Sequence, residues 1–183
     1  MSRTWFTADT HFGHGRIIEL CGRPYKNVGE MDADLIARWN SVVQEGDDVW
    51  HLGDFCHRSA RPARDYLQRL RGRVHLVHGN HDNLDTRSCA LFASSQPFAQ
   101  AKVEGVRLCL LHYGMRVWPG SRRGALHLYG HSHGRLPGDR QCVDVGVDYA
   151  PWAYRPVSLA ELQAHLLTLP ERGPGDRGGE VAR

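Results

Sequence analysis

The chain has 183 residues and a formal net charge of +3, and 41% of its residues are hydrophobic and 23% charged. This length suits one domain with a substantial core, and the mild positive charge indicates at most an anionic ligand, not a nucleic-acid-binding surface. No apolar run approaches the length of a membrane span and the N-terminus has no signal-peptide core, so we expect a cytoplasmic protein without a membrane partner.

Strands and helices are predicted to alternate along the first half of the chain. The hydrophobic pattern predicts strands at residues 3–8, 49–52, 73–77, 98–103, 107–111, 125–129 and 141–147. It predicts helices at residues 14–21, from Asn27 to about Gln44, at 61–71 and from Ser158 through Leu167. Residues 1–170 therefore form one α/β domain, and the Gly-, Pro- and charge-rich residues 171–183 are expected to form a flexible tail.

Histidine is unusually frequent, with twelve residues, and five cysteines accompany it. The cysteines lie singly without CxxC spacing, so neither a cysteine zinc site nor a disulfide framework is expected. Histidine, asparagine and aspartate side chains instead follow strand after strand where each strand ends. In open α/β sheets such residues meet at the carboxyl ends of the strands, so we expect them to line one crevice.

These strand-end residues form a ligand set for two divalent cations. Imidazole nitrogen and carboxylate oxygen together suit first-row transition metals, whereas magnesium and calcium prefer oxygen alone. Asp-x-His and His-x-His spacings place both side chains on the same side of an extended segment. Manganese is the favoured metal, with iron, zinc, nickel and cobalt as alternatives. The candidate ligands are Asp9, His11, Asp54, Asn80, His112, His131 and His133.

The order of the motifs that contain these residues resembles a known family. The motifs are Asp9-Thr10-His11, Gly53-Asp54, Gly79-Asn80-His81-Asp82, His112 and Gly130-His131-Ser132-His133. Together they resemble the signature of the calcineurin-like metallophosphoesterases over about residues 4–148. The opening Asp9-Thr10-His11-Phe12-Gly13-His14 is similar to a small subgroup of stand-alone prokaryotic and phage phosphoesterases. The resemblance implies a two-sheet α-β-β-α sandwich with helices on the outer faces of the sheets.

The resemblance also implies a role for each residue. One metal would be held by Asp9, His11 and His133, and the other by Asn80, His112 and His131. Asp54 would bridge the two metals, and a metal-bridging hydroxide would attack phosphorus in line. His81 would contact the phosphate and protonate the leaving group as general acid, while Asp82 would orient the His81 ring through a hydrogen bond.

The segment after Asp54 departs from the protein-phosphatase branch of this family. That branch has Asp-Arg-Gly here, whereas His57 precedes Arg58 in this chain, and His78 replaces the arginine that precedes Gly-Asn-His. A histidine three residues after the bridging Asp is similar to the double-strand-break repair nucleases of the superfamily. These differences argue against a protein phosphatase and favour phosphodiesters. His14, His57 and Arg58 are candidate substrate-binding residues, although each also fits an ordinary surface turn.

The predicted activity is therefore hydrolysis of small phosphodiesters, with nucleotides among the candidate substrates. One alternative is a phosphomonoesterase that acts on small phosphorylated metabolites or nucleotides. Another is a non-catalytic scaffold that binds metal only for structure, which is less favoured because this chain keeps every ligand and the catalytic histidine. A nuclease subunit would need a dense basic strip with interleaved aromatic residues, which the sequence lacks.

Overall fold

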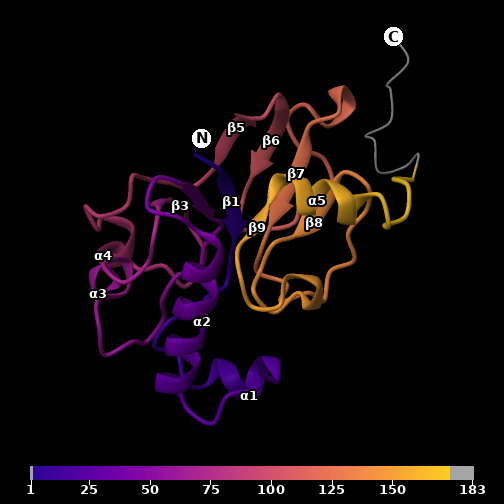
Figure 1. Ribbon diagram of the computed structural model, residues 1–183. Coiled ribbons are helices and arrows are strands. Elements are labelled where there is room, and N and C mark those ends of the chain that lie inside the picture. The colour runs from indigo at the N-terminus through magenta and orange to yellow at the C-terminus, as the bar shows by residue number, and fades with distance from the viewer. Residues whose placement is uncertain (1, 174–183) are drawn as a thin grey trace.

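The structure is a computed structural model that describes residues 2–173, and its strands form two sheets (Figure 1). The first sheet has the order β4-β3-β2-β1-β9 and consists of β1 (Thr4–Thr7), β2 (Asp48–His51), β3 (Arg73–Val77), β4 (Ser94–Gln96) and β9 (Val157–Ser158). The second has the order β5-β6-β7-β8 and consists of β5 (Ala99–Val103), β6 (Val106–Leu110), β7 (Leu126–Tyr129) and β8 (Cys142–Asp144). The predicted two-sheet sandwich is confirmed.

The strands that precede the candidate ligands run parallel within each sheet. β1, β2 and β3 are parallel neighbours, as are β6, β7 and β8, whereas β9 and β5 pair antiparallel at their edges. A parallel bridge between Ala8 and Gly146 joins the two sheets just beyond β1 and β8, and the Val147 amide donates to the Ala8 carbonyl at 3.0 Å. The carboxyl ends of both sets of strands therefore meet at one edge of the sandwich.

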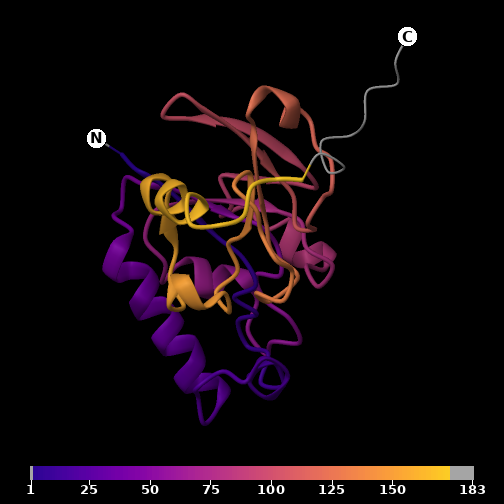
Figure 2. The same cartoon turned by 90° about the vertical axis from the view of Figure 1, so that its right-hand side faces the viewer.

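The helices are α1 (Ile17–Cys21), α2 (Val28–Val42), α3 (Ala63–Leu67), α4 (Leu84–Arg87) and α5 (Leu159–Leu166). The two longest begin where the sequence supplies a cap. The Asn27 side chain accepts a hydrogen bond from the Glu30 amide at 2.9 Å, and Ser158 and Glu161 form a complete capping box at the start of α5. α1 lies at one end of the long α2 (Figure 2).

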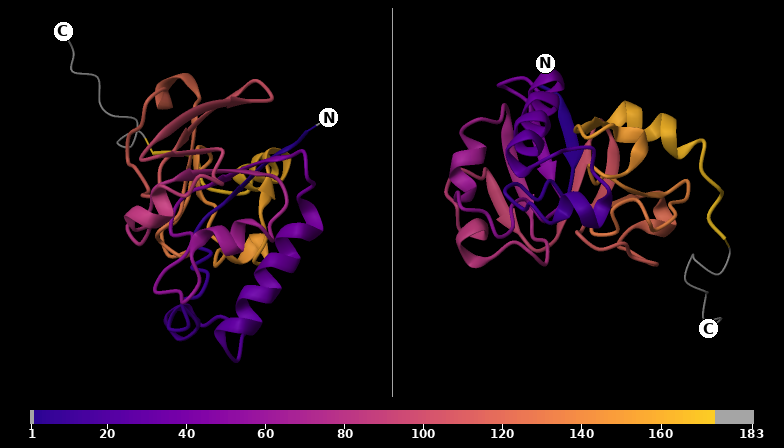
Figure 3. Two further views of the ribbon diagram at one scale, coloured as in Figure 1. Left: turned by 90° about the vertical axis from the view of Figure 1, so that its left-hand side faces the viewer. Right: turned by 90° about the horizontal axis from the view of Figure 1, so that it is seen from below.

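Alternate residues of the central strands face two different cores because successive side chains of a strand point to opposite faces. On β1, Trp5 packs with α2 residues such as Trp39, while Phe6 packs with residues of the second sheet such as Leu128 and Val143. Viewed from below, α2 lies outside the first sheet and the second sheet lies on the other side (Figure 3). Phe6 and Leu128 are completely buried, so the inter-sheet core is the centre of the fold.

A small separate core lies on the second sheet. Cys109, Trp118 and Ala125 form it, supplied partly by the loop before β7. α5 instead contributes Leu162 and Leu166 to the core between the sheets. The reason is its position in the chain, since α5 directly follows the edge strand β9 and packs beside it.

The short strands β4 and β9, the α-helix α4 and two 3-10 helices (Ser121–Arg123 and Ala150–Trp152) were not predicted, and α3 is shorter than the predicted helix at residues 61–71. β4 is polar (Ser94–Gln96) and is stabilised by its parallel pairing with β3, so it carries no hydrophobic alternation. In the predicted tail, Arg172 is buried over the Trp118 ring at 4.1 Å. The rest of that prediction, residues 174–183, lies outside the described residues.

The inter-sheet core gives a first prediction. Leu128→Ala should lower the free energy of unfolding by about 2–5 kcal/mol, because a fully buried leucine leaves a cavity between two sheets that cannot collapse freely. Leu84→Ala is the matched control, since Leu84 is 78% exposed, and it should change the free energy by less than about 0.5 kcal/mol. Urea denaturation measures both, and equal losses would contradict the assignment of Leu128 to the central core.

Candidate metal centre

Two groups of potential metal ligands face each other at the carboxyl edge of the sandwich. Ligand atoms of Asp9, His11 and His133 all lie within 4.8 Å of one another, and the same holds for Asp54, His112 and His131. Asp54 also connects the groups, because its Oδ2 lies 3.5 Å from His11 Nε2 and 3.4 Å from His112 Nε2. The structure thus brings together the sequence-predicted residues, with Asp54 where a bridging carboxylate would stand.

Asn80 completes the second group. Its Oδ1 lies 3.0 Å from His112 Nε2, while His112 Nδ1 lies 2.7 Å from the Leu52 carbonyl. A proton on Nδ1 would donate to that carbonyl and leave the Nε2 lone pair directed at Asn80 and Asp54. Three lone-pair atoms then converge on one point, an arrangement that a cation would satisfy.

The ligands sit on turns with unusual backbone geometry. Positive φ angles occur at Asp9 (57°), His11 (49°), Asp54 (57°), His131 (65°) and His133 (48°). A left-handed conformation costs a non-glycine residue roughly 1–2 kcal/mol, and such strain persists only where the surrounding structure enforces it. Here the left-handed conformation directs the side chains that follow β1, β2 and β7 toward one site.

Hydrogen bonds to buried carboxylates enforce these turns. Asp82 is 2% exposed and accepts from the backbone amides of Gly79 at 2.8 Å and of Asp54 and Phe55 at 2.9 Å. Asp9 accepts from the His131 amide at 2.9 Å, which ties the first sheet to the second. Burial raises the pKa of Asp82, an effect opposed by the three amide donors, which favour the carboxylate.

The contacts of Asp82 differ from the expected hydrogen bond to the His81 ring. Among the described residues, its Oδ1 accepts from the Phe55 amide and its Oδ2 from the Asp54 and Gly79 amides, and it makes no hydrogen bond to the His81 imidazole. It supports the turn that carries Asp54. The His81 amide donates to Asp54 Oδ1 at 2.8 Å, so His81 is joined to the site through its backbone instead.

Glycine is required where the β2 and β3 turns touch. A Cβ at Gly79 would lie 2.2 Å from Asp54 Oδ1, and one at Gly53, whose φ is +92°, would lie 2.6 Å from Gly79 Cα. These distances are shorter than any real contact, so larger residues would displace Asp54. The Gly-Asp and Gly-Asn-His motifs are thus sterically coupled.

His11 shows that the donor set fits a metal. Both of its ring nitrogens are buried, and neither has a hydrogen-bond partner among the described residues. Burial lowers the pKa of His11 to about 2, with Asp54 opposing and Arg23 reinforcing the shift, so the ring is neutral and its lone pair is free. An unpaired buried polar atom is costly, and a cation bound to His11, Asp9 and His133 would remove this cost.

A carboxylate that sequence reasoning missed holds His133. Asp148 Oδ2 lies 2.7 Å from His133 Nδ1, which leaves His133 Nε2 as the atom available to a metal. Burial lowers the pKa of His133, but the hydrogen bonds with Asp148 and Cys21 and the negative charges of Asp9 and Asp148 together raise it to about 10. One signal was available in the sequence, since Asp148 directly follows the strand predicted at residues 141–147.

Arg23, also missed, connects both sides of this ligand group. Its guanidinium donates to both oxygens of Asp148 at 2.8 Å and to the backbone carbonyls of Asp9 at 2.7 Å and Thr10 at 3.0 Å. Arg23 is 4% exposed, so these are buried charge-assisted bonds. No local pattern identifies it, because Arg23 and Asp148 are 125 residues apart in the chain.

Three further histidines form a cluster beside the ligands. In this histidine cluster (His14, His57 and His81), the ring centroids of His14 and His57 are 4.7 Å apart and those of His57 and His81 4.2 Å apart. His81 lies 5.4 Å from His11 by the same measure. Burial, and then His57 and His81, lowers the pKa of His14 to about 4, and burial also lowers the pKa of His57.

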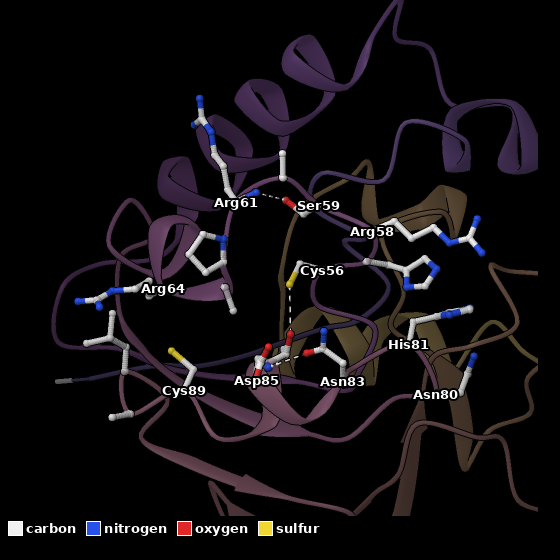
Figure 4. A pocket seen from close by; sticks show the side chains of 17 residues that line it. Cys56, Arg58, Ser59, Arg61, Arg64, Asn80, His81, Asn83, Asp85 and Cys89 are labelled. Carbon is white, nitrogen blue, oxygen red and sulfur yellow. Dashed lines mark hydrogen bonds between the residues drawn. The ribbon is translucent and has the colours of Figure 1, made fainter.

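Arg58 lies next to this cluster in the chain. It is exposed, adopts a left-handed backbone with φ of 48°, and makes no hydrogen bond or ion pair with any described residue. Figure 4 shows its side chain above His81. The structure thus brings the three candidate substrate-binding residues to the side of the metal ligands on which His81 lies.

Comparison with known proteins decides the family. The sequence profile of the calcineurin-like phosphoesterase superfamily domain matches residues 4–146. The chain belongs to this family. It is accordingly a metal-dependent phosphoesterase, a hydrolase. None of the helices between residues 2 and 173 has the length and apolar character needed to cross a bilayer.

Several relatives of this phosphoesterase are recognisable. This chain is 31% identical over 168 residues to an uncharacterised protein of Methanocaldococcus jannaschii, and the matched region covers 87% of this chain and 88% of that protein. The gene 66 protein of Mycobacterium phage L5 is 42% identical over 85 residues, which cover 45% of this chain and 41% of the phage protein. A protein of unknown function from Aquifex aeolicus shares the fold with a TM-score of 0.70 and 23% identity, over 90% of this chain and 100% of that one.

The Asp148–His133 contact gives a prediction about metal affinity. Asp148→Asn keeps the shape of the side chain but removes the charge that orients and polarises His133, so the affinity for Mn²⁺ should fall about 10–100-fold. Asp34→Asn is the matched control, because Asp34 lies on α2 and bonds Arg38 and Tyr25. Isothermal titration calorimetry measures both variants; an unchanged affinity in Asp148→Asn would show that Asp148 serves only the fold.

Proposed function

We propose that this phosphoesterase hydrolyses small phosphodiesters, nucleotides among them, at a binuclear centre that uses Mn²⁺. The observation that carries the proposal is the composition of the wall beside the ligands. It consists of three histidines, and Arg58 is the arginine next to them whose charge is not neutralised by any carboxylate within residues 2–173. The single positive charge of Arg58 matches the single negative charge of a phosphodiester, whereas a phosphomonoester carries up to two negative charges.

The proposed ligands divide between two cations. Asp9, His11 and His133 would hold the first, Asn80, His112 and His131 the second, and Asp54 would contact both. When bound, the cations supply an activated water and offset the negative charge that develops on the phosphoryl oxygens.

The remaining roles belong to the histidine cluster and Arg58. His14 and His57 have lowered pKa values, so as neutral rings they would donate N–H hydrogen bonds to phosphoryl oxygens without adding charge. Arg58 would pair with the charge of the diester. His81, half-buried and close to both His11 and His57, is the proposed proton donor to the leaving oxygen.

The charge argument predicts a substrate preference. In the presence of Mn²⁺, kcat/KM should be at least about tenfold higher for bis(4-nitrophenyl) phosphate than for 4-nitrophenyl phosphate, a difference of about 1.4 kcal/mol in transition-state stabilisation. Absorbance of released nitrophenol measures both. Excess chelator should abolish both reactions, and a preference for the monoester would instead assign the protein to phosphomonoesters.

The role of His81 gives a separate prediction. His81→Ala should lower kcat for the diester by about 10²–10⁴-fold, because proton transfer to the leaving group is lost, while Mn²⁺ affinity stays unchanged. His165→Ala, in a histidine of α5 that bonds Tyr149, is the matched control and should keep full activity. A parallel loss of Mn²⁺ binding in His81→Ala would make His81 a ligand and remove it as the acid.

A further inference from the structure

A large cavity opens directly beside His81. It has a volume of about 820 Å³ and lies between residues 56–64 and residues from 80 to 91 (Figure 4). We call it the side pocket. Asn80 and His81 belong to its lining, so the side pocket is continuous with the candidate metal centre. Cavities of 300–1,000 Å³ are typical of sites for small organic ligands.

The wall of the side pocket is mainly apolar away from His81. Cys56 and Ala63 line it and are buried, and Leu91, which is 47% exposed, also lines it. Figure 4 shows the Arg61 and Arg64 side chains pointing outward, away from the pocket. Of the arginines that line the pocket, only Arg58 lies beside His81, so positive charge is concentrated at the end of the pocket that meets the metal centre.

Several polar side chains of the wall are already hydrogen-bonded to protein atoms. Cys56 Sγ and Thr86 Oγ1 are 3.4 Å apart, Ser59 Oγ lies 2.8 Å from the Tyr66 hydroxyl, and Asn83 Oδ1 accepts from the Thr86 amide at 2.8 Å. These side chains therefore offer an occupant few free hydrogen-bonding atoms, and Asn83 Nδ2 and Asp85 are the polar groups that remain in this part of the lining. Sulfur and aliphatic carbon surfaces instead suit the faces and edges of aromatic rings.

The position of His81 decides which part of a substrate would enter. In the proposed hydrolysis the oxygen of water bonds to phosphorus, the bond from phosphorus to the leaving oxygen breaks, and His81 gives that oxygen a proton. The leaving oxygen must therefore lie at His81, between the ligands and the side pocket. The organic group attached to it would extend away from the metal centre and into the pocket.

We infer that the side pocket binds the leaving alcohol of the substrate, and that this alcohol carries a planar, largely apolar ring system. The inference rests on the proposed function and deepens it by naming a substrate class: phosphodiesters with an aromatic leaving group.

The kinetic test compares two diesters whose leaving alcohols have similar acidity, methyl phenyl phosphate and methyl 2-naphthyl phosphate. With Mn²⁺ bound, kcat/KM should be about tenfold higher for the naphthyl ester, because the second ring is buried in the pocket. Ala90→Trp and Ala60→Trp, which fill the pocket from opposite walls at exposed positions, should remove this preference. Ala37→Trp, at an exposed position on α2, is the matched control and should keep it.

A binding test separates the side pocket from the proposed activity. Fluorescence titration with 2-naphthol should show saturable binding to the wild type and to Ala37→Trp, and at least about tenfold weaker binding to Ala90→Trp and Ala60→Trp. Equal binding by all four proteins, or an unchanged naphthyl preference in both filled variants, would overturn the inference that the side pocket binds the leaving alcohol. If the filled variants lose 2-naphthol binding but the wild type hydrolyses the monoester faster than the diester, only the diester proposal would be overturned.

Discussion

Buried carboxylates that accept backbone N–H bonds are the constraint on which the rest of this site depends. Asp82 gathers amides from the turns after β2 and β3, Asp9 receives an amide from the turn after β7, and Asp144 accepts from Gly134 and Gly146. These bonds hold the strand-end turns in the left-handed conformation, which would otherwise be unfavourable. The carboxyl edge of the sandwich is therefore preorganised before any ligand binds.

The same burial that makes these bonds strong leaves the site electrostatically unbalanced. It raises the pKa of Asp9 to about 7, against the influence of His133 and His112, and it lowers the pKa of His11 to about 2. In the absence of a cation, His11 is thus neutral and Asp9 is partly protonated near pH 7. A divalent ion favours the charged form of the carboxylate, so metal binding and the stability of this edge are coupled.

The surface beyond the ligands has two parts with different chemistry. The histidine cluster and Arg58 offer hydrogen-bond donors and a single positive charge, and the side pocket behind His81 offers apolar wall. His57, Arg58 and His81 belong to both parts. This arrangement supports separate recognition of the phosphoryl group and of its leaving alcohol. It connects the proposed diester hydrolysis to the proposed substrate class.

The sequence by itself determined the family, the two-sheet sandwich and the set of residues at the strand ends, because alternating apolar residues and the polar residues after them are local patterns. Tertiary structure decided what those patterns do not contain. Arg23 meets Asp148 across 125 positions, Asp82 turns to backbone amides instead of His81, and β4 exists only because β3 pairs with it. The side pocket likewise forms between two separate segments. Each depends on packing between distant residues, whose free energy no single stretch of sequence records.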